Sequence, residues 1–83
     1  MTKAERELRS DLKKISDKYA VKRTDSTIEI SYNNALLCRL SKEKSFGWCL
    51  EFALNVVFAN IQGLKLLEDI IPLIKKFEVT ENE

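Results

Sequence analysis

The segment FGWCLEFALNVVFA, residues 46–59, is the most apolar stretch of this 83-residue chain. A helix that crosses a membrane needs about 20 predominantly apolar residues. This segment has only 14 residues, and Glu51 and Asn55 lie inside it. We therefore expect it to lie in the core of a soluble domain, as either a helix or a strand.

The alternation of large and small side chains in this segment favours a strand over a helix. On a strand, successive side chains point to opposite faces. The large apolar residues then share one face: Trp48, Leu50, Phe52, Leu54, Val56 and Phe58. A helix would instead turn Trp48 and Phe52 toward its polar side. We therefore predict a strand over residues 46–54, and residues 55–60 either continue it or begin the last helix.

The first part of the chain predicts an amphipathic helix. The sequence TKAE fits a capping box, in which the Thr2 side chain accepts from a backbone N–H and the Glu5 side chain reaches back to the cap. We expect the helix to end near Lys18 or Tyr19. Its apolar side chains recur at three- and four-residue spacing: Ala4, Leu8, Leu12, Ile15 and Tyr19.

Three short strands are expected next, in an antiparallel meander. They are YAVKR (19–23), TIEISY (27–32) and ALLCRL (35–40), each followed by polar turn residues. Asn33 and Asn34 tolerate the positive φ angles that a two-residue hairpin turn requires.

Strict alternation sorts the side chains of these strands into two faces. The inward set is Ile28, Ile30, Tyr32, Leu36, Cys38 and Leu40, and the outward set includes Ala35, Leu37 and Arg39. If the apolar segment pairs with them, Arg39 lies between Glu29 and Glu51 on the outer face. Cys38 and Cys49 then lie on opposite faces, which argues against a disulfide between them.

The last helix is predicted over residues 60–77, with Asn60 as its N-cap. Two adjacent apolar stripes cover about half of its circumference, more than an ordinary surface helix shows. Pro72 lies inside this pattern, and we expect it to kink the helix near Glu68 or to restart it from an N-cap at Asp69. The stripes consist of Leu64, Leu67, Ile71 and Ile74, and of Leu66, Ile70, Leu73 and Phe77.

These elements predict a small α+β domain with an N-terminal helix, a three- to four-stranded antiparallel meander and a C-terminal helix. The compact domain is expected over residues 1–78, with an acidic flexible tail at residues 79–83. The composition is 45% hydrophobic and 33% charged, which is typical of a globular chain. The charged N-terminal sequence lacks the apolar core of a signal peptide, which favours the cytoplasm.

No residue pattern in the chain indicates catalysis. Histidine is absent, which removes the commonest general base and transition-metal ligand. The two cysteines form neither a Cys-x-x-Cys pair nor a zinc-binding pattern. Gly47 and Gly63 are isolated, so no phosphate-binding loop is expected. We therefore expect no enzymatic activity, no cofactor, no metal site and no small-molecule substrate.

Nucleic-acid binding is the alternative function. The expected order of helix, three strands and helix resembles that of double-stranded-RNA-binding domains. Those domains have a lysine-rich start to their last helix, whereas here NIQGLKLLED carries only Lys65, so no RNA-contacting residues follow from the resemblance. Acidic residues are interleaved with the basic ones, which weakens any field they make. The basic residues of this alternative are Arg6, Arg9, Lys13, Lys14, Lys18, Lys22 and Arg23.

Protein binding is the main functional prediction. A domain of this length buries only about 60% of the surface of its unfolded chain, so a partner would add stability. The outward sheet face and the wide apolar arc of the last helix predict surface left for a homodimer, an adaptor contact or an inhibitory contact. Small domains of this kind are often accessory proteins of bacteria, phages or mobile elements. The expected partner-binding residues are Leu37, Arg39, Cys49, Glu51, Ala53, Leu66, Ile70, Leu73 and Phe77.

Overall fold

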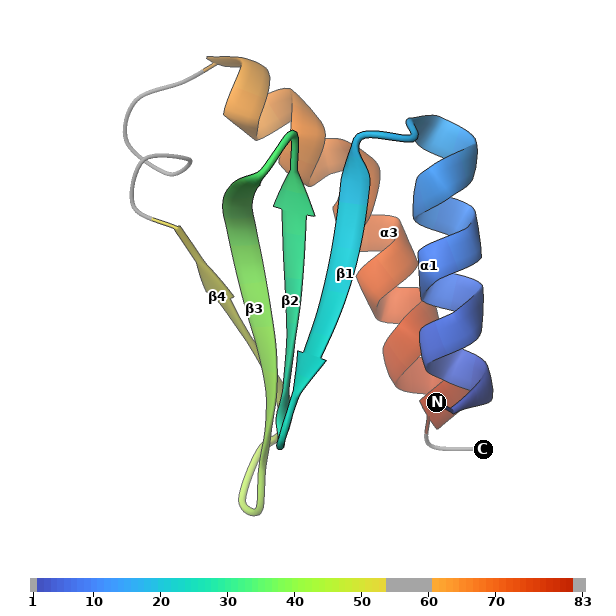
Figure 1. Ribbon diagram of the computed structural model, residues 1–83. Coiled ribbons are helices and arrows are strands. Elements are labelled where there is room, and N and C mark those ends of the chain that lie inside the picture. The colour runs from blue at the N-terminus through green and yellow to red at the C-terminus, as the bar shows by residue number, and fades with distance from the viewer. Residues whose placement is uncertain (1, 54–60, 82–83) are drawn as a thin grey trace.

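The computed structural model of the chain describes residues 2–53 and 61–81. Its elements are α1 (Lys3–Ile15), β1 (Tyr19–Thr24), β2 (Thr27–Tyr32), β3 (Ala35–Glu43), β4 (Gly47–Phe52) and α3 (Ile61–Glu81). The four strands form one antiparallel sheet in the order β1-β2-β3-β4. Both helices pack against one face of this sheet, with α1 next to β1 (Figure 1). The predicted α+β architecture is confirmed.

β4 confirms that the first half of the apolar segment is a strand, and the helical alternative is wrong. In the pairing with β3, Leu50 lies opposite Leu40, and Phe52 lies opposite Cys38. The large side chains of β4 therefore share the inner face of the sheet, as the alternation predicts. Residues 54–60 lie outside the described residues, and with them the continuation of this segment and the predicted cap at Asn60.

Two turns fix the register of the hairpins. Asn33 and Asn34 have φ angles of 52° and 69°, as the two-residue turn between β2 and β3 requires. The connection from β3 to β4 has three residues before Gly47, whose φ angle of 79° lies in the left-handed region. Glycine adopts this conformation without strain, so Gly47 closes the loop and begins β4.

α1 is shorter than its sequence pattern predicts. It ends at Ile15, and the prediction of an end near Lys18 or Tyr19 is wrong. Tyr19 instead begins β1, where it is 1% exposed and its ring meets that of Tyr32 edge-on at 5.0 Å. Burial of this ring in the sheet contributes more than one further helical turn would. Ile15, the preceding member of the predicted stripe, is 45% exposed.

The start of α1 carries a buried ion pair in place of a full capping box. The Thr2 side chain accepts from the Glu5 N–H at 3.2 Å, as predicted. The Glu5 carboxylate is 2% exposed and accepts from Nη1 of Arg23 at 2.8 Å, while Nη2 of Arg9 lies 3.6 Å from its second oxygen. The prediction that Glu5 reaches back to the cap is wrong, because an arginine of β1 offers it a stronger, charge-assisted bond.

A β-bulge corrects the predicted faces of β3. The pairing with β2 shifts at one point: Cys38 lies opposite Ile30, and then Leu36 lies opposite Ser31. Leu37 is the inserted residue and is 4% exposed. Leu36 shares the outer face with Ser31 and is partly exposed. The prediction that Leu36 faces inward and Leu37 outward is therefore wrong, because strict alternation does not allow for an inserted residue.

α3 runs without a break and bends along its length (Figure 1). Pro72 lies inside it, where the missing N–H removes one helical hydrogen bond and favours a bend. The bend agrees with the predicted kink, whereas the alternative of a restart at Asp69 is wrong. Residues 79–81 are part of α3, which extends beyond the predicted end of the last helix at Phe77.

The closed part of the core lies under β1, β2 and β3. Every described element except β4 contributes fully buried apolar side chains: Ala4, Leu8, Leu12, Tyr19, Ile28, Ile30, Leu37, Cys38, Leu40, Leu67, Ile70 and Phe77. From β4, Trp48, Leu50 and Phe52 pack against this core but remain partly exposed. The β4 side of the domain is therefore the less covered one.

Candidate binding surfaces

The outer face of the sheet carries a charged cluster where the sequence predicts one. Arg39 on β3 lies 3.0 Å from a Glu29 oxygen on β2 and 3.3 Å from a Glu51 oxygen on β4. The arginine side chain is 42% exposed and that of Glu51 is 75% exposed. Each exposed pair contributes less than about 1 kcal/mol. The cluster therefore supports the strand register.

The structure divides the predicted partner-binding residues into three groups. Those that belong to the buried core are Leu37, Ile70 and Phe77. Those that lie on the outer sheet face are Arg39, Cys49 and Glu51. Those that pack against the core while partly exposed are Ala53, Leu66 and Leu73. The bulge therefore buries Leu37 and places Leu36 on the outer sheet face in its stead.

The two cysteines are free and differ in environment. Cys38 is fully buried on the inner face, and burial raises the pKa of its thiol to about 12. Cys49 is partly exposed and lies opposite Ser41 on the outer face. A thiol with a raised pKa stays protonated near neutral pH and is a poor nucleophile, so Cys38 has the properties of a core residue.

The basic residues of the alternative nucleic-acid site do not converge on one surface. Arg9 and Arg23 are directed to the Glu5 carboxylate. The ammonium group of Lys13 donates to the backbone carbonyl of Asp17 at 2.9 Å. That of Lys14 lies 3.8 Å from a carboxylate oxygen of Asp11. The other members are exposed on separate elements: Arg6 on α1, Lys18 in the turn after it and Lys22 on β1. This dispersion gives nucleic-acid binding no support.

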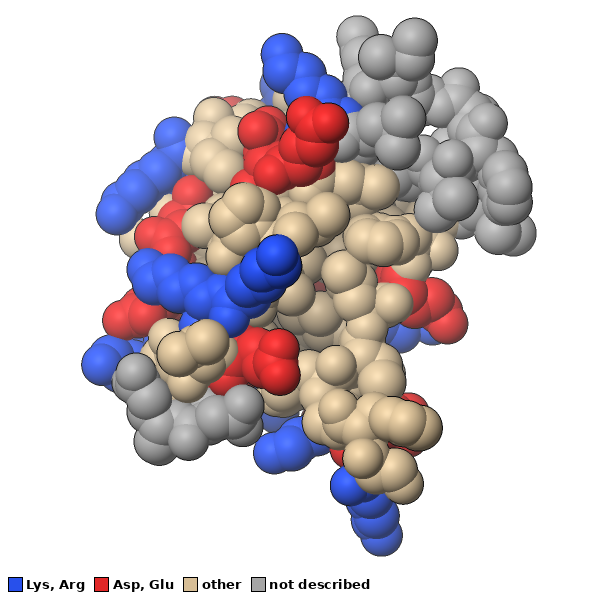
Figure 2. All heavy atoms as spheres, turned by 180° about the vertical axis from the view of Figure 1, so that it is seen from behind, with Lys and Arg blue, Asp and Glu red and all other residues tan. Residues whose placement is uncertain are grey.

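Among the described residues, a partly exposed apolar area lies between β4 and α3. It consists of partly exposed side chains on the two elements together with Phe46 of the β3–β4 hairpin, which is 84% exposed. Figure 2 shows uncharged side chains from the middle of that view down to the hairpin. We call this area the β4–α3 surface, and its members are Phe46, Trp48, Leu50, Phe52, Ile71 and Ile74.

Two contacts show how α3 presents its side of this surface. The ring of Phe77 meets the Trp48 ring edge-on at 5.1 Å. On the other side of the helix, Lys76 reaches Asp11 of α1 at 2.9 Å. Residues three or four apart share one side of a helix, so Ile74, one turn before Phe77, lies on the β4 side.

Comparisons with protein-family models, characterised proteins and solved structures give no match for this chain. In the described part of the chain, no three histidine, cysteine, aspartate or glutamate side chains are grouped so that they could hold a metal ion. Neither helix of residues 2–53 and 61–81 combines the length and the apolar composition of a membrane span. The function is therefore inferred from the geometry of the surfaces.

Proposed function

We propose that this chain is a non-catalytic protein-binding domain that forms a homodimer through β4. One observation carries the proposal. β4 is an end strand of the described sheet, and its inner apolar side chains are partly exposed, whereas Ile28 and Ile30 of β2 and Leu40 of β3 are at most 1% exposed. A strand edge beside exposed apolar side chains is a typical site for the addition of another strand.

The backbone of β4 offers hydrogen-bonding groups along this edge. The Ala53 N–H donates to the Leu37 carbonyl at 2.9 Å, in the same register as the β3–β4 pairing. In an antiparallel sheet, the groups of successive residues alternate between the two edges of a strand. The N–H and C=O groups of Trp48, Leu50 and Phe52 therefore point away from β3.

A second copy of β4 fits this edge in an antiparallel register. With Leu50 on the two-fold axis, Leu50 faces its own copy, and Trp48 faces Phe52 on the inner side. Apolar cross-strand pairs of this kind stabilise a sheet. On the outer side, Cys49 faces Glu51, so no like charges lie opposite one another. A two-fold dimer uses one surface twice, and this strand meets that requirement.

The dimer would also place the β4–α3 surfaces of the two copies next to one another across the continuous sheet. Each Å² of apolar surface that the dimer removes from water contributes about 25 cal/mol to the free energy of association. The net charge of +1 adds little repulsion between copies. Both cysteines are free, which suits a reducing compartment such as the cytoplasm.

Sedimentation equilibrium over a range of protein concentrations tests the homodimer with two matched variants. Cys49→Glu places a carboxylate opposite Glu51 of the other copy at two symmetric positions, and Cys49→Lys places an ammonium group there. We expect the first variant to weaken self-association about tenfold and the second to strengthen it. Thermal unfolding of both variants at low concentration checks that the monomer fold is retained.

Two results would contradict this function. A wild-type chain that remains monomeric at every concentration would rule out the homodimer, and the β4–α3 surface would then be left for another protein. Self-association that changes by the same factor in both Cys49 variants would show that the interface lies elsewhere, because only the proposed register gives the two charges opposite effects.

A further inference from the structure

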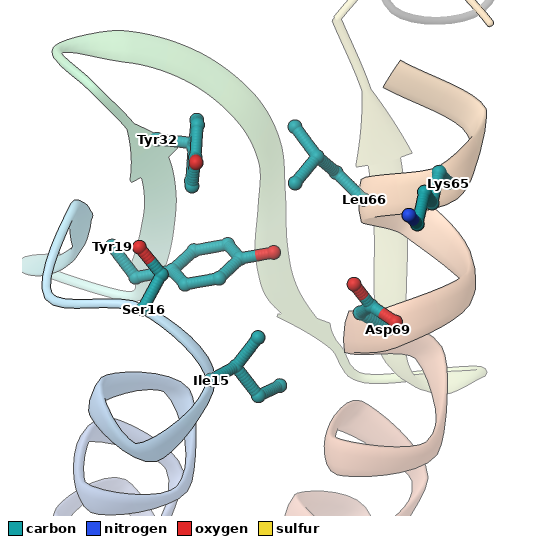
Figure 3. Close-up of a pocket in the computed structure, with 7 residues that line it drawn as sticks. All are labelled: Ile15, Ser16, Tyr19, Tyr32, Lys65, Leu66 and Asp69. Carbon is teal, nitrogen blue, oxygen red and sulfur yellow. The ribbon is translucent and has the colours of Figure 1, made fainter. Parts of the chain in front are cut away.

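A second site lies apart from β4, where the end of α1 meets β1, β2 and α3. A pocket of about 380 Å³ opens there. Figure 3 shows the side chains around it, which come from both helices and from the start and end of the first hairpin. Its apolar walls are the rings of Tyr19 and Tyr32 and the aliphatic side chains of Ile15 and Leu66.

The hydroxyl group of Tyr19 is the feature that sets this pocket apart. The side chain is 1% exposed, and its Oη atom has no hydrogen-bond partner among the residues that the structure describes. In Figure 3 the hydroxyl points across the pocket toward α3, on which Asp69 faces it. A buried hydroxyl without a partner is destabilising, and a ligand group that bonds to it recovers this loss.

The α3 side of the pocket carries two opposite charges. Lys65 and Asp69 stand one helical turn apart, and both are exposed at the rim. Among the described residues, neither forms an ion pair with the other or with a third side chain. Both charges are therefore available to a ligand that carries groups of both signs.

We propose that this pocket binds a free α-amino acid with an apolar side chain. Its ammonium group lies between the Asp69 carboxylate and Tyr19 Oη. The N–H groups of the ammonium donate hydrogen bonds to a carboxylate oxygen of Asp69 and to Tyr19 Oη. Its carboxylate meets the ammonium group of Lys65. Its side chain lies between Leu66 and the ring of Tyr32. The two charged groups of an α-amino acid are attached to one carbon, so they are close enough together to meet two receptors one helical turn apart.

The local electrostatics agree with a cation beside Tyr19. Burial, and after it the negative charge of Asp69, raise the pKa of the Tyr19 hydroxyl to about 12. Burial disfavours a charge of either sign, so only the contribution of the Asp69 carboxylate favours a positive group beside the Tyr19 hydroxyl. The volume of the pocket lies within the range of roughly 300–1,000 Å³ that small-molecule sites usually have.

Three probes of related shape test the assignment by calorimetry and by nuclear magnetic resonance on the ¹⁵N-labelled full chain. L-phenylalanine carries both charges, phenethylamine carries the ammonium group only, and 3-phenylpropionate carries the carboxylate only. We expect the amino acid to bind at least about fivefold more tightly than the amine, since one charge-assisted hydrogen bond corresponds to such a factor. The acid should bind most weakly, because Asp69 repels it.

Substitutions assign the contacts. Tyr19→Phe keeps the ring and removes Oη, and Asp69→Asn keeps the shape of the side chain and removes its charge. We expect each to weaken L-phenylalanine binding at least about fivefold. Lys65→Met should make the affinity for L-phenylalanine equal to that for phenethylamine. Asp25→Asn, in the exposed turn between β1 and β2, is the matched control and should leave binding unchanged.

Several results would overturn the proposal. One is the absence of shifts at the pocket residues with about 10 mM L-phenylalanine, which would mean that water alone fills the site. Another is equal affinity for the amino acid and the amine in the wild-type chain. A third is unchanged affinity in Asp69→Asn, an exposed helical position where misfolding is not expected. The site is independent of the homodimer, so Cys49→Glu should retain the affinity for L-phenylalanine.

Discussion

The inner face of the sheet has two regions that differ in how completely they are covered. Under β2 and β3, Ile28, Ile30 and Leu40 are at most 1% exposed. Under β4, Trp48, Leu50 and Phe52 are partly exposed, although their sequence is more apolar. The comparison shows that apolar sequence alone does not define the core. The region under both helices stabilises the fold, and the region at β4 keeps apolar surface that a partner can cover.

Truncation of one side chain in each region should produce the largest difference. Ile30→Ala removes a fully buried side chain and should lower the free energy of unfolding by about 3 kcal/mol. Leu50→Ala at β4 should cost about half as much, because its side chain is partly exposed before the change. Urea denaturation at a concentration where the chain is monomeric gives both values. Equal losses would mean that the two regions do not differ in their contribution to stability.

Loss of the buried Glu5 carboxylate should have the next largest effect on the free energy of unfolding, because this group joins α1 to β1 in the closed region. Glu5→Gln keeps the size of the side chain but removes the buried anionic partner of Arg23, whose own side chain is 39% exposed. We expect a loss of about 2 kcal/mol in unfolding free energy. Glu78→Gln, at an exposed site of α3, is the control and should change stability by less than about 0.5 kcal/mol.

Alkaline pH should weaken the closed region through Cys38. The pKa of its thiol is raised from 9.0 to about 12 in the folded chain, so between these values the folded state holds a proton that the unfolded state releases. The stabilising effect is complete below pH 9.0 and falls as the pH rises toward 12, by at most about 1.4 kcal/mol per pH unit.

The variant Cys38→Ala separates the loss of stability caused by ionisation of the Cys38 thiol from that caused by other groups that titrate at alkaline pH. Its stability should decline less steeply with pH than that of the wild-type chain, whatever its stability at neutral pH. Tyr19 contributes in the same direction, since its raised pKa also favours the protonated folded state. Chemical denaturation at a series of pH values measures the two slopes, and identical slopes would show that Cys38 is not the group responsible.

Much of this fold follows from the sequence because its signals are local. The period-two alternation around Trp48 predicts β4, and Asn33 with Asn34 predicts the hairpin turn. Those assignments in turn predict that Arg39 lies between two glutamates. The bulge at Leu37 could not be predicted in this way, because an inserted residue changes the face of a side chain without changing the composition of the strand. The prediction that Leu37 lies on the outer face was wrong for that reason.

The pocket could not be predicted from the sequence, because its members are distant in the chain. Tyr19 fits the apolar stripe of a longer α1 as well as the start of β1, and only the packed structure shows which it joins. Asp69 and Lys65 have the spacing of an ordinary solvated pair on a helix. Their proximity to the Tyr19 hydroxyl, which has no partner in the described part of the chain, arises from the way α3 crosses the end of the sheet (Figure 3).

The charged cluster on the outer face should have a small effect on stability. Arg39→Met removes both ion pairs and should cost less than about 1 kcal/mol, because the guanidinium group is 42% exposed. High salt should reduce the cost further, because exposed pairs are screened. Denaturation at low and high ionic strength tests this, and a large loss that does not depend on salt would mean that Arg39 acts through packing.

Phe46 should have the smallest effect on stability and so provides the sharpest test of the open region. It is 84% exposed in the β3–β4 hairpin, so Phe46→Ser removes almost no buried surface from the monomer. We expect the free energy of unfolding to change by less than about 0.5 kcal/mol. Self-association should nevertheless weaken, because the ring extends the β4–α3 surface that the second copy would cover. A variant that keeps both its stability and its self-association would confine the interface to β4, whereas a loss of monomer stability would show that the hairpin belongs to the closed region.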